Sequence, residues 1–156
     1  MAESGLKVKK VKVPDAFLPC QFTEAGVIVM VKRTKGNTIL CIEDEEDIRT
    51  FACKVLELEG YHCIQAKIAS EALQILAEEE IDLILLDLKL DEPDGWEILK
   101  NLKKTTETSH IPLIVCTASP AQPQKNRALE LGAVDYLVKP LSANVLREAV
   151  FRVFPV

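Results

Sequence analysis

The 156-residue sequence lacks any apolar run long enough to cross a membrane. Its longest apolar runs, Val27 to Val31 and Leu83 to Leu86, fall far short of the roughly 20 residues that a membrane helix needs. The N-terminus carries small and charged residues and no apolar secretory signal, so we expect a cytoplasmic protein. Internal repeats and low-complexity segments are also missing, and the length fits one domain with a short extension.

Paired cysteine motifs are absent as well. The five cysteines are scattered, without CxxC spacing or a metal-site pattern. Cys41 and Cys116 lie inside apolar stretches, which favours buried, reduced thiols over a disulfide. The two histidines, His62 and His110, are expected at the surface or beside strands and not in catalysis.

The net charge is −5, and it is unevenly distributed. Residues 1–36 hold seven Lys and Arg against three acids, a balance of +4, whereas residues 37–156 hold twelve against twenty-one, a balance of −9. The acidic body argues against sequence-independent nucleic-acid binding by the main domain. The short basic stretch from Lys7 to Lys12 is expected to be a solvated tail.

From Asn37 onward, short apolar runs alternate with segments of helical periodicity. The apolar runs predict five strands at Thr38–Ile42, Tyr61–Ala66, Ile81–Asp87, Ile111–Thr117 and Ala133–Val138. Apolar residues spaced three and four apart predict helices around residues 48–56, 72–76, 96–102, 128–131 and 145–153, the first ending at Gly60 and the fourth at Gly132. This alternation is typical of an α/β fold with a doubly wound parallel sheet covered by helices on both faces.

Residues 1–36 do not continue the alternation. They contain scattered Pro and Gly and one apolar run, Val27–Val31. We therefore expect a domain at residues 37–156 that follows an N-terminal extension, either partly mobile or packed as an arm or an added strand.

Polar residues follow four of the predicted strands. Glu43 and Asp44 end the first, Asp87 the third, Thr117 the fourth, and Lys139 the fifth. Ligands of doubly wound sheets bind outside the carboxyl ends of the strands, so three carboxylates, a hydroxyl and an ammonium are expected to gather there.

Three clustered acids repel one another and suppress each other's ionisation unless cations intervene. Oxygen-rich sites suit Mg²⁺ above all, and Mg²⁺ together with Lys139 would balance the three negative charges. If Asp87 became an acyl phosphate, the same cations would still hold it. The pattern therefore fits a carboxylate nucleophile that accepts a phosphoryl group.

Each part also has an ordinary structural interpretation. An acid pair after a strand often caps a helix, a lone Asp often belongs to a turn, and a Lys-Pro pair is commonly a surface turn. The joint occurrence of these residues, in order and at strand ends, favours a functional site over these alternatives.

Four segments resemble the sequence blocks of response-regulator receiver domains. They are ILCIEDEEDIR, LILLDLKLDEPDGWEIL, IPLIVCTAS and GAVDYLVKPL, and the resemblance covers Asn37 to about Phe154. It implies the CheY-like, flavodoxin-like fold, a three-layer α/β/α arrangement with five parallel strands in the order 2-1-3-4-5. It also implies a stand-alone module of two-component phosphorelay signalling.

The resemblance implies roles for the acids. Asp87 would be the phosphoacceptor and would attack the phosphohistidine of a sensor histidine kinase or a phosphotransfer protein. Asp44 would bind Mg²⁺ directly and Glu43 through water, while Lys89 would offer its backbone carbonyl to the metal. The chain would not be an enzyme beyond its own phosphorylation and autodephosphorylation.

The resemblance also implies roles for three residues near the phosphate. The Thr117 hydroxyl would bond a phosphoryl oxygen, and Lys139 would pair with Asp87 or its phosphate. Tyr136 matches an aromatic switch that turns inward when Thr117 moves; without the family, a packed aromatic is an equal interpretation. The Lys139–Pro140 bond is expected to be cis.

The sequence departs from the family pattern at two positions. The acidic pair is Glu-Asp and not Asp-Asp, and Asp91 stands where the family often has proline, which predicts a looser turn before Asp94. Neither change removes an essential group. The Lys89 side chain and Ser119 lie at variable positions beside the phosphate, and we expect them to tune its lifetime.

Output is expected from a downstream protein that binds the face formed by the fourth helix, the last strand and the last helix. No DNA-binding reader and no membrane contact are expected in this chain, and a homodimer stays open. Two other functions remain: a docking scaffold independent of phosphorylation, and an aspartyl-phosphate phosphatase. The phosphatase usually needs a second acid two residues after the nucleophile, where this chain has Lys89.

Overall fold

The computed structural model describes residues 21–22, 28–29 and 36–155. The chain divides into two units, Met1–Gly36 and Asn37–Val156. In the first unit, β1 (Gln21–Phe22) pairs with β2 (Ile28–Val29) in antiparallel register. The predicted run Val27–Val31 thus contributes a short strand, and its other residues lie outside the described part of the chain.

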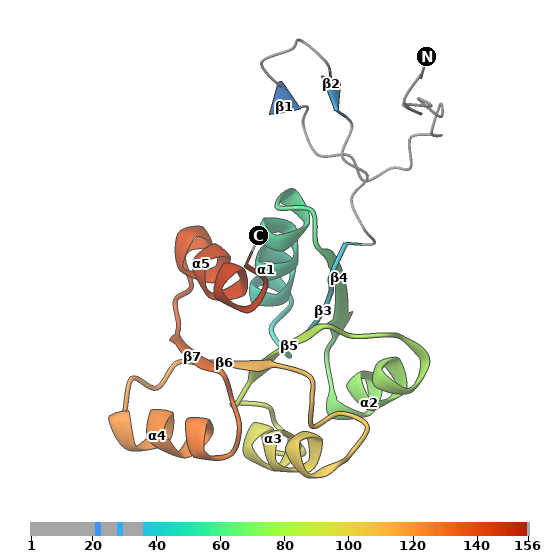
Figure 1. Ribbon diagram of the computed structural model, residues 1–156. Helices are drawn as coiled ribbons and strands as arrows, with labels where there is room; N and C mark the ends of the chain where they lie inside the picture. Colours follow the sequence, from blue (N-terminus) through green and yellow to red (C-terminus); the bar gives the residue numbers. More distant parts are fainter. Residues whose placement is uncertain (1–20, 23–27, 30–35, 156) are drawn as a thin grey trace. The chain divides into compact units, whose positions relative to one another are not determined.

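The second unit alternates strands and helices from its beginning to its end (Figure 1). Its ten elements are β3 (Thr38–Ile42), α1 (Glu46–Leu58), β4 (His62–Ala66), α2 (Ala69–Glu78), β5 (Leu83–Asp87), α3 (Gly95–Lys104), β6 (Leu113–Thr117), α4 (Gln122–Glu130), β7 (Asp135–Val138) and α5 (Ala143–Val153). Each predicted strand and helix is present, with ends that differ by a few residues because apolar flanks such as Ile81 and Ile111 precede the paired backbone.

The five strands form one parallel sheet in the order β4-β3-β5-β6-β7, which confirms the predicted fold and strand order. Every residue of β3, β5 and β6 is buried, as expected for strands covered on both faces, whereas the edge strand β4 is partly exposed. The most apolar strand, β5, occupies the centre and ends at Asp87.

Helices cover both faces of the sheet: α1 and α5 lie on one side, and α2, α3 and α4 on the other (Figure 1). Alternating residues of each strand divide the core accordingly. Leu83 and Leu85 pack with α1 and α5, whereas Ile84 and Leu86 pack with α2, α3 and α4. Burying each such side chain contributes about 1.5–3 kcal/mol, so both faces fix the strand that carries Asp87.

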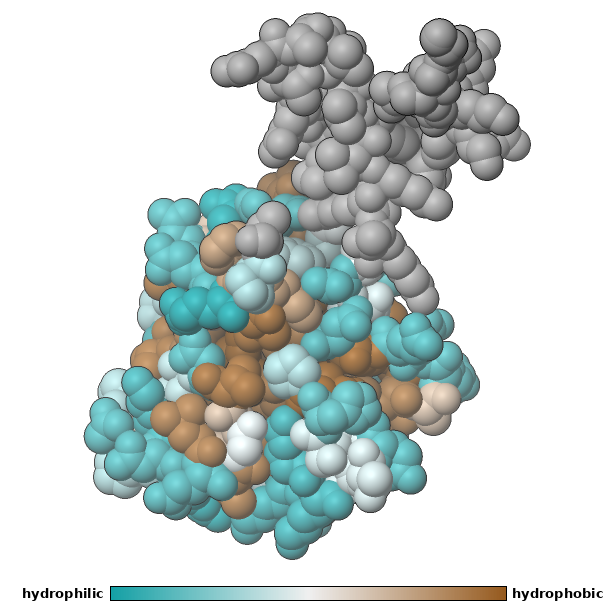
Figure 2. Space-filling view, in the orientation of Figure 1, coloured by the Kyte–Doolittle hydropathy of each residue, from teal (hydrophilic) through white to brown (hydrophobic). Residues whose placement is uncertain are grey.

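Apolar residues gather in a band between the two helix layers, and hydrophilic residues cover most of the outer helix surfaces (Figure 2). Gly60 and Gly132 end α1 and α4 with φ values of 86° and 110°, a backbone conformation that glycine adopts without steric cost. Among the described residues, no helix is long and apolar enough to span a membrane.

Candidate functional site

The predicted acidic cluster exists at the carboxyl edge of the sheet. Glu43 follows β3, Asp44 is the next residue, and Asp87 ends the neighbouring strand β5. One carboxylate oxygen from each of the three side chains lies within 4.8 Å of the others. Glu43 and Asp87 are buried, while Asp44 is half-buried and opens the cluster toward solvent.

Lys139 brings a cation into the cluster from the loop after β7. Its Nζ lies 2.5 Å from Glu43 Oε2 and 3.2 Å from Asp87 Oδ2. The family resemblance predicted the pairing with Asp87, whereas the shorter contact, to Glu43, was not predicted. The Lys139–Pro140 peptide bond is cis, as expected, and so is the Glu92–Pro93 bond.

Burial and neighbouring charges change the protonation of this ion pair. Burial raises the pKa of the Glu43 carboxyl to about 7, opposed by the hydrogen bond from Lys139 and reinforced by Asp87. Burial alone would lower the pKa of Lys139, but Glu43 and Asp87 outweigh it and hold the pKa above its usual value. Lys139 is therefore a permanent cation at neutral pH.

Backbone amides complete the surroundings of the two buried acids. The N–H of Lys89 donates to Asp87 Oδ1 at 2.9 Å, and the N–H of Glu45 donates to Glu43 Oε1 at 3.2 Å. The family resemblance implies that the backbone carbonyl of Lys89 faces the metal, whereas the bond from its amide to Asp87 was not predicted. The loop after β5 thereby orients the Asp87 carboxylate while the Lys89 side chain is exposed.

Thr117 lies on β6, the strand beside Asp87, and Tyr136 lies on β7, the next strand along the sheet. Asp87 is in register with Cys116 of β6, so the buried Thr117 stands one residue further along the same edge. The N–H of Ser119 lies 3.5 Å from Thr117 Oγ1, and the Ser119 carbonyl accepts a 2.7 Å hydrogen bond from Tyr136 Oη. The Tyr136 ring is buried, and burial raises the pKa of its phenol.

The donor set fits a hard divalent ion. When all three carboxylates are ionised, they and the Lys139 ammonium leave a net charge of −2 in the cluster. Ligand oxygens around Mg²⁺ stand about 2.1 Å from the ion and hence roughly 3–4 Å from one another, which is compatible with three oxygens that all lie within 4.8 Å of one another. Glu43, Asp44 and Asp87 could therefore hold Mg²⁺ with water completing its shell.

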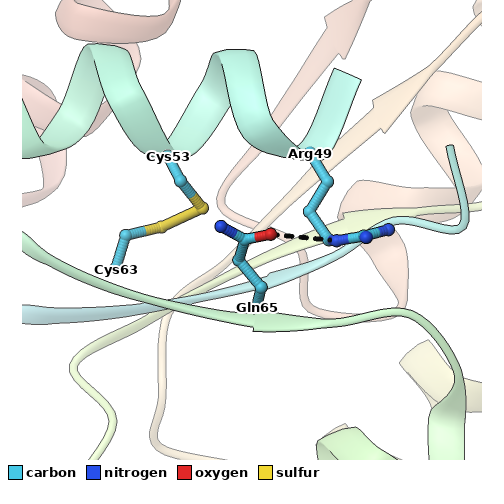
Figure 3. Close-up of a disulfide and its surroundings, with 4 residues drawn as sticks. All are labelled: Arg49, Cys53, Cys63 and Gln65. Carbon is cyan, nitrogen blue, oxygen red and sulfur yellow. Dashed lines mark hydrogen bonds between the residues drawn. A yellow bond between two sulfur atoms is a disulfide. The ribbon is translucent and has the colours of Figure 1, made fainter. Parts of the chain in front are cut away.

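The cysteines are arranged differently from one another. Cys41 and Cys116 are free, buried thiols, as predicted, and burial raises the pKa of both, that of Cys41 to about 12. Cys53 of α1 and Cys63 of β4 form a disulfide with their Cα atoms 5.5 Å apart (Figure 3). The spacing of these two cysteines carries no motif, so the sequence did not predict the bond.

Comparison with known proteins agrees with this geometry. Residues 39–151 match the response regulator receiver domain family. The sequence is 39% identical over 111 residues to the phosphate regulon transcriptional regulatory protein PhoB of Pseudomonas aeruginosa, covering 71% of this chain and 48% of that protein. It is 36% identical over 120 residues to the sporulation initiation phosphotransferase F of Bacillus subtilis, covering 77% and 95%.

Solved structures give the same result. A response regulator receiver domain protein from Clostridium thermocellum superposes with a TM-score of 0.68 at 31% identity, covering 75% of this chain and 93% of that one. A chemotaxis protein, CheY4 of Vibrio cholerae, shares the fold with a TM-score of 0.71 at 24% identity, covering 76% and 98%. The chain spans about half the length of the first curated relatives it matches.

Proposed function

The chain belongs to the response regulator receiver domain family, a family of signalling domains of two-component systems, and from this premise we propose that residues 37–156 accept a phosphoryl group on Asp87. The observation that carries the proposal is the environment of that carboxylate. Asp87 is buried at the end of the central strand, paired with Lys139 and grouped with two further acids.

The Asp87 carboxylate would attack the phosphorus of a phosphohistidine on a sensor kinase or phosphotransfer protein. An O–P bond forms, the P–N bond breaks, and the departing imidazole takes up a proton. The rigid strand and the N–H of Lys89 hold the nucleophile in one orientation, which removes much of the entropic cost of the reaction. Bound Mg²⁺ would neutralise charge on the phosphoryl oxygens.

Lys139 and Thr117 would receive the transferred group. Phosphorylation turns one negative charge on Asp87 into about two. Lys139, already 3.2 Å from Asp87, remains charged and can pair with a phosphoryl oxygen. Thr117 ends the adjacent strand and can donate its hydroxyl to another.

A short hydrogen-bonded route leads from this site to a partner surface. Movement of Thr117 would act on Ser119, whose carbonyl accepts the bond from Tyr136 Oη. Tyr136 belongs to β7, between α4 and α5, and we propose that a downstream protein or a second copy binds this α4–β7–α5 face. Phosphorylation would shift the population of two arrangements of that face.

The decisive experiment is intact mass spectrometry after incubation with acetyl phosphate and Mg²⁺. We expect the mass of one phosphoryl group in the wild type and in Asp91→Asn, a control that removes an exposed acid four residues further along the same loop. Asp87→Asn and chelation by EDTA should both abolish the gain. Folded wild-type protein that gains no mass would refute the proposal, and steady turnover of phosphate esters would favour a phosphatase instead.

The lifetime of the phosphoryl group is a separate part of the proposal. The Lys89 side chain is exposed and Ser119 is half-buried beside Thr117, so both can affect access of water to the acyl phosphate. Substituting both Lys89 and Ser119 should change the rate at which the phosphorylated mass peak decays after the phosphodonor is removed. An unchanged decay rate would refute the proposed effect of these two residues on the lifetime, but not the proposed phosphorylation of Asp87.

A further inference from the structure

Arg49 of α1 reaches back to the acidic pair without touching a carboxylate in the contacts observed. Its Nη1 donates to the backbone carbonyl of Glu43 at 2.7 Å and to that of Asp44 at 3.3 Å. Its Nε donates to the side-chain carbonyl of Gln65 on β4 at 3.1 Å (Figure 3). One guanidinium therefore connects the two peptide units that carry the acids to the edge strand.

These two carbonyls lie just before the backbone ladder of α1. The first helical bond runs from the Arg49 N–H to the Glu45 carbonyl, and the N-cap Glu45 makes no side-chain capping bond. The carbonyls of Glu43 and Asp44 thus precede the ladder, and the Arg49 side chain supplies donors to them. Since the backbone sets the direction of each Cα–Cβ bond, holding these peptide units limits the positions that the two carboxylates can reach.

The disulfide holds α1 against β4 close to the hydrogen bond between Arg49 and Gln65. Cys53 lies four residues after Arg49, on the same face of α1, and Cys63 lies two residues before Gln65, on the same face of β4. The covalent link and the Arg49–Gln65 hydrogen bond are therefore neighbouring connections between one helix and one strand (Figure 3). The part of α1 that carries Arg49 is therefore joined to β4 by both a covalent bond and a hydrogen bond.

We propose that Arg49 is a positioning residue for the metal site, acting through the backbone of Glu43 and Asp44. The proposal rests on the proposed function, because it takes these acids as the Mg²⁺ ligands. The sign of its effect separates positioning from charge. A guanidinium near the cluster repels a second cation, so a purely electrostatic role means that removing Arg49 tightens Mg²⁺ binding. A positioning role means that removal weakens it.

The test is a calorimetric Mg²⁺ titration of the full chain and its variants. Arg49→Ala should bind Mg²⁺ about 10-fold or more weakly, the range found when partners of metal ligands are removed. Arg49→Lys should be similarly weak, since an ammonium keeps the charge but lacks the planar fork that spans several acceptors. Gln65→Ala should fall between these variants and the wild type.

Lys54→Ala is the matched control, because it removes a cation from an exposed position of the same helix and should bind Mg²⁺ like the wild type. Thermal unfolding in EDTA distinguishes a positioning role of Arg49 from a merely structural one. If the role is structural, the variants have a lower melting temperature, but the folded protein binds Mg²⁺ with unchanged affinity. Arg49→Ala and Arg49→Lys with wild-type or tighter affinity would overturn the proposal. A wild type that binds no Mg²⁺ would overturn the proposed function as well.

Discussion

Gly95, the first residue of α3, offers the most severe test of how the site is built. It is buried against the backbone that follows Asp87. A Cβ added here would lie 2.5 Å from the Asp87 carbonyl oxygen and 2.7 Å from that of Leu88, and it would also overlap the Leu88 Cα. Ordinary contacts begin at 3.4 Å, so Gly95→Ala must displace the loop that follows β5 by roughly 1 Å.

The displacement should damage both stability and metal binding. Overpacking costs about 1–3 kcal/mol, and the 3.2 Å hydrogen bond from the Gly95 N–H to the Leu88 carbonyl would be lost at about 0.5–1.5 kcal/mol. We therefore expect Gly95→Ala to lower the free energy of unfolding by about 2–4 kcal/mol. Mg²⁺ affinity should fall about 10-fold or more, because the ion demands near-ideal octahedral ligand geometry.

Urea unfolding and calorimetric Mg²⁺ titration would measure the two effects, with Gly132→Ala as the matched control. Gly132 has φ of 110°, so alanine there costs about 1–3 kcal/mol of backbone strain, and its Cβ would meet only the flexible Lys103 side chain at 3.2 Å. The control should lose stability but keep its Mg²⁺ affinity. Wild-type stability and Mg²⁺ affinity in Gly95→Ala would refute the reasoning.

Two further predictions concern the stability contributed by the Tyr136 hydrogen bond, including its dependence on pH, and the stability contributed by the disulfide. Tyr136→Phe removes the 2.7 Å bond to Ser119 and should cost about 0.5–1.5 kcal/mol in urea unfolding at pH 7. Burial raises the pKa of Tyr136, so the folded protein holds the phenolic proton longer. The stability that this pKa shift contributes is fully present below the unfolded-state pKa of about 10 and is lost as the pH rises through the folded-state pKa. Phenylalanine does not titrate, so Tyr136→Phe should lose less stability above pH 10 than the wild type. Replacing Cys53 and Cys63 with Ser opens a loop with a sequence separation of 10 and should cost about 2–3 kcal/mol; a dithiol reductant should lower wild-type stability equally and leave the variant unchanged.

The sheet could be predicted from sequence because burial on both faces leaves a continuous apolar signal. Leu83 to Leu86 is such a run, and it forms the central strand, whereas the weaker run at His62–Ala66 forms an edge. Parallel strands share one carboxyl edge, so the order of elements alone brings the acids after β3 and β5 together. The prediction of a carboxylate cluster with a lysine follows from topology and needs no side-chain detail.

Contacts that depend on the direction of a side chain could not be predicted from the sequence. Lys139 and Glu43 are 96 residues apart, and their 2.5 Å contact depends on how the loop after β7 folds over the cluster. Arg49 belongs to a helix whose charged residues would ordinarily be read as a solvated surface. Only the packing of α1 against β4 turns its side chain toward the acidic pair, and the same packing brings Cys53 to Cys63.

Gly95 shows why an identifiable residue can still be misunderstood from sequence. The pair Asp94-Gly95 indicates a turn, in which glycine is usually explained by a positive φ. Among the described glycines only Gly60 and Gly132 have such a φ, so Gly95 is not needed for conformation. It is needed for space, because the start of α3 lies against the backbone of Asp87 and Leu88. A Gly95→Ala variant therefore tests how closely that helix packs against the Asp87 backbone, which turn propensity alone does not reveal.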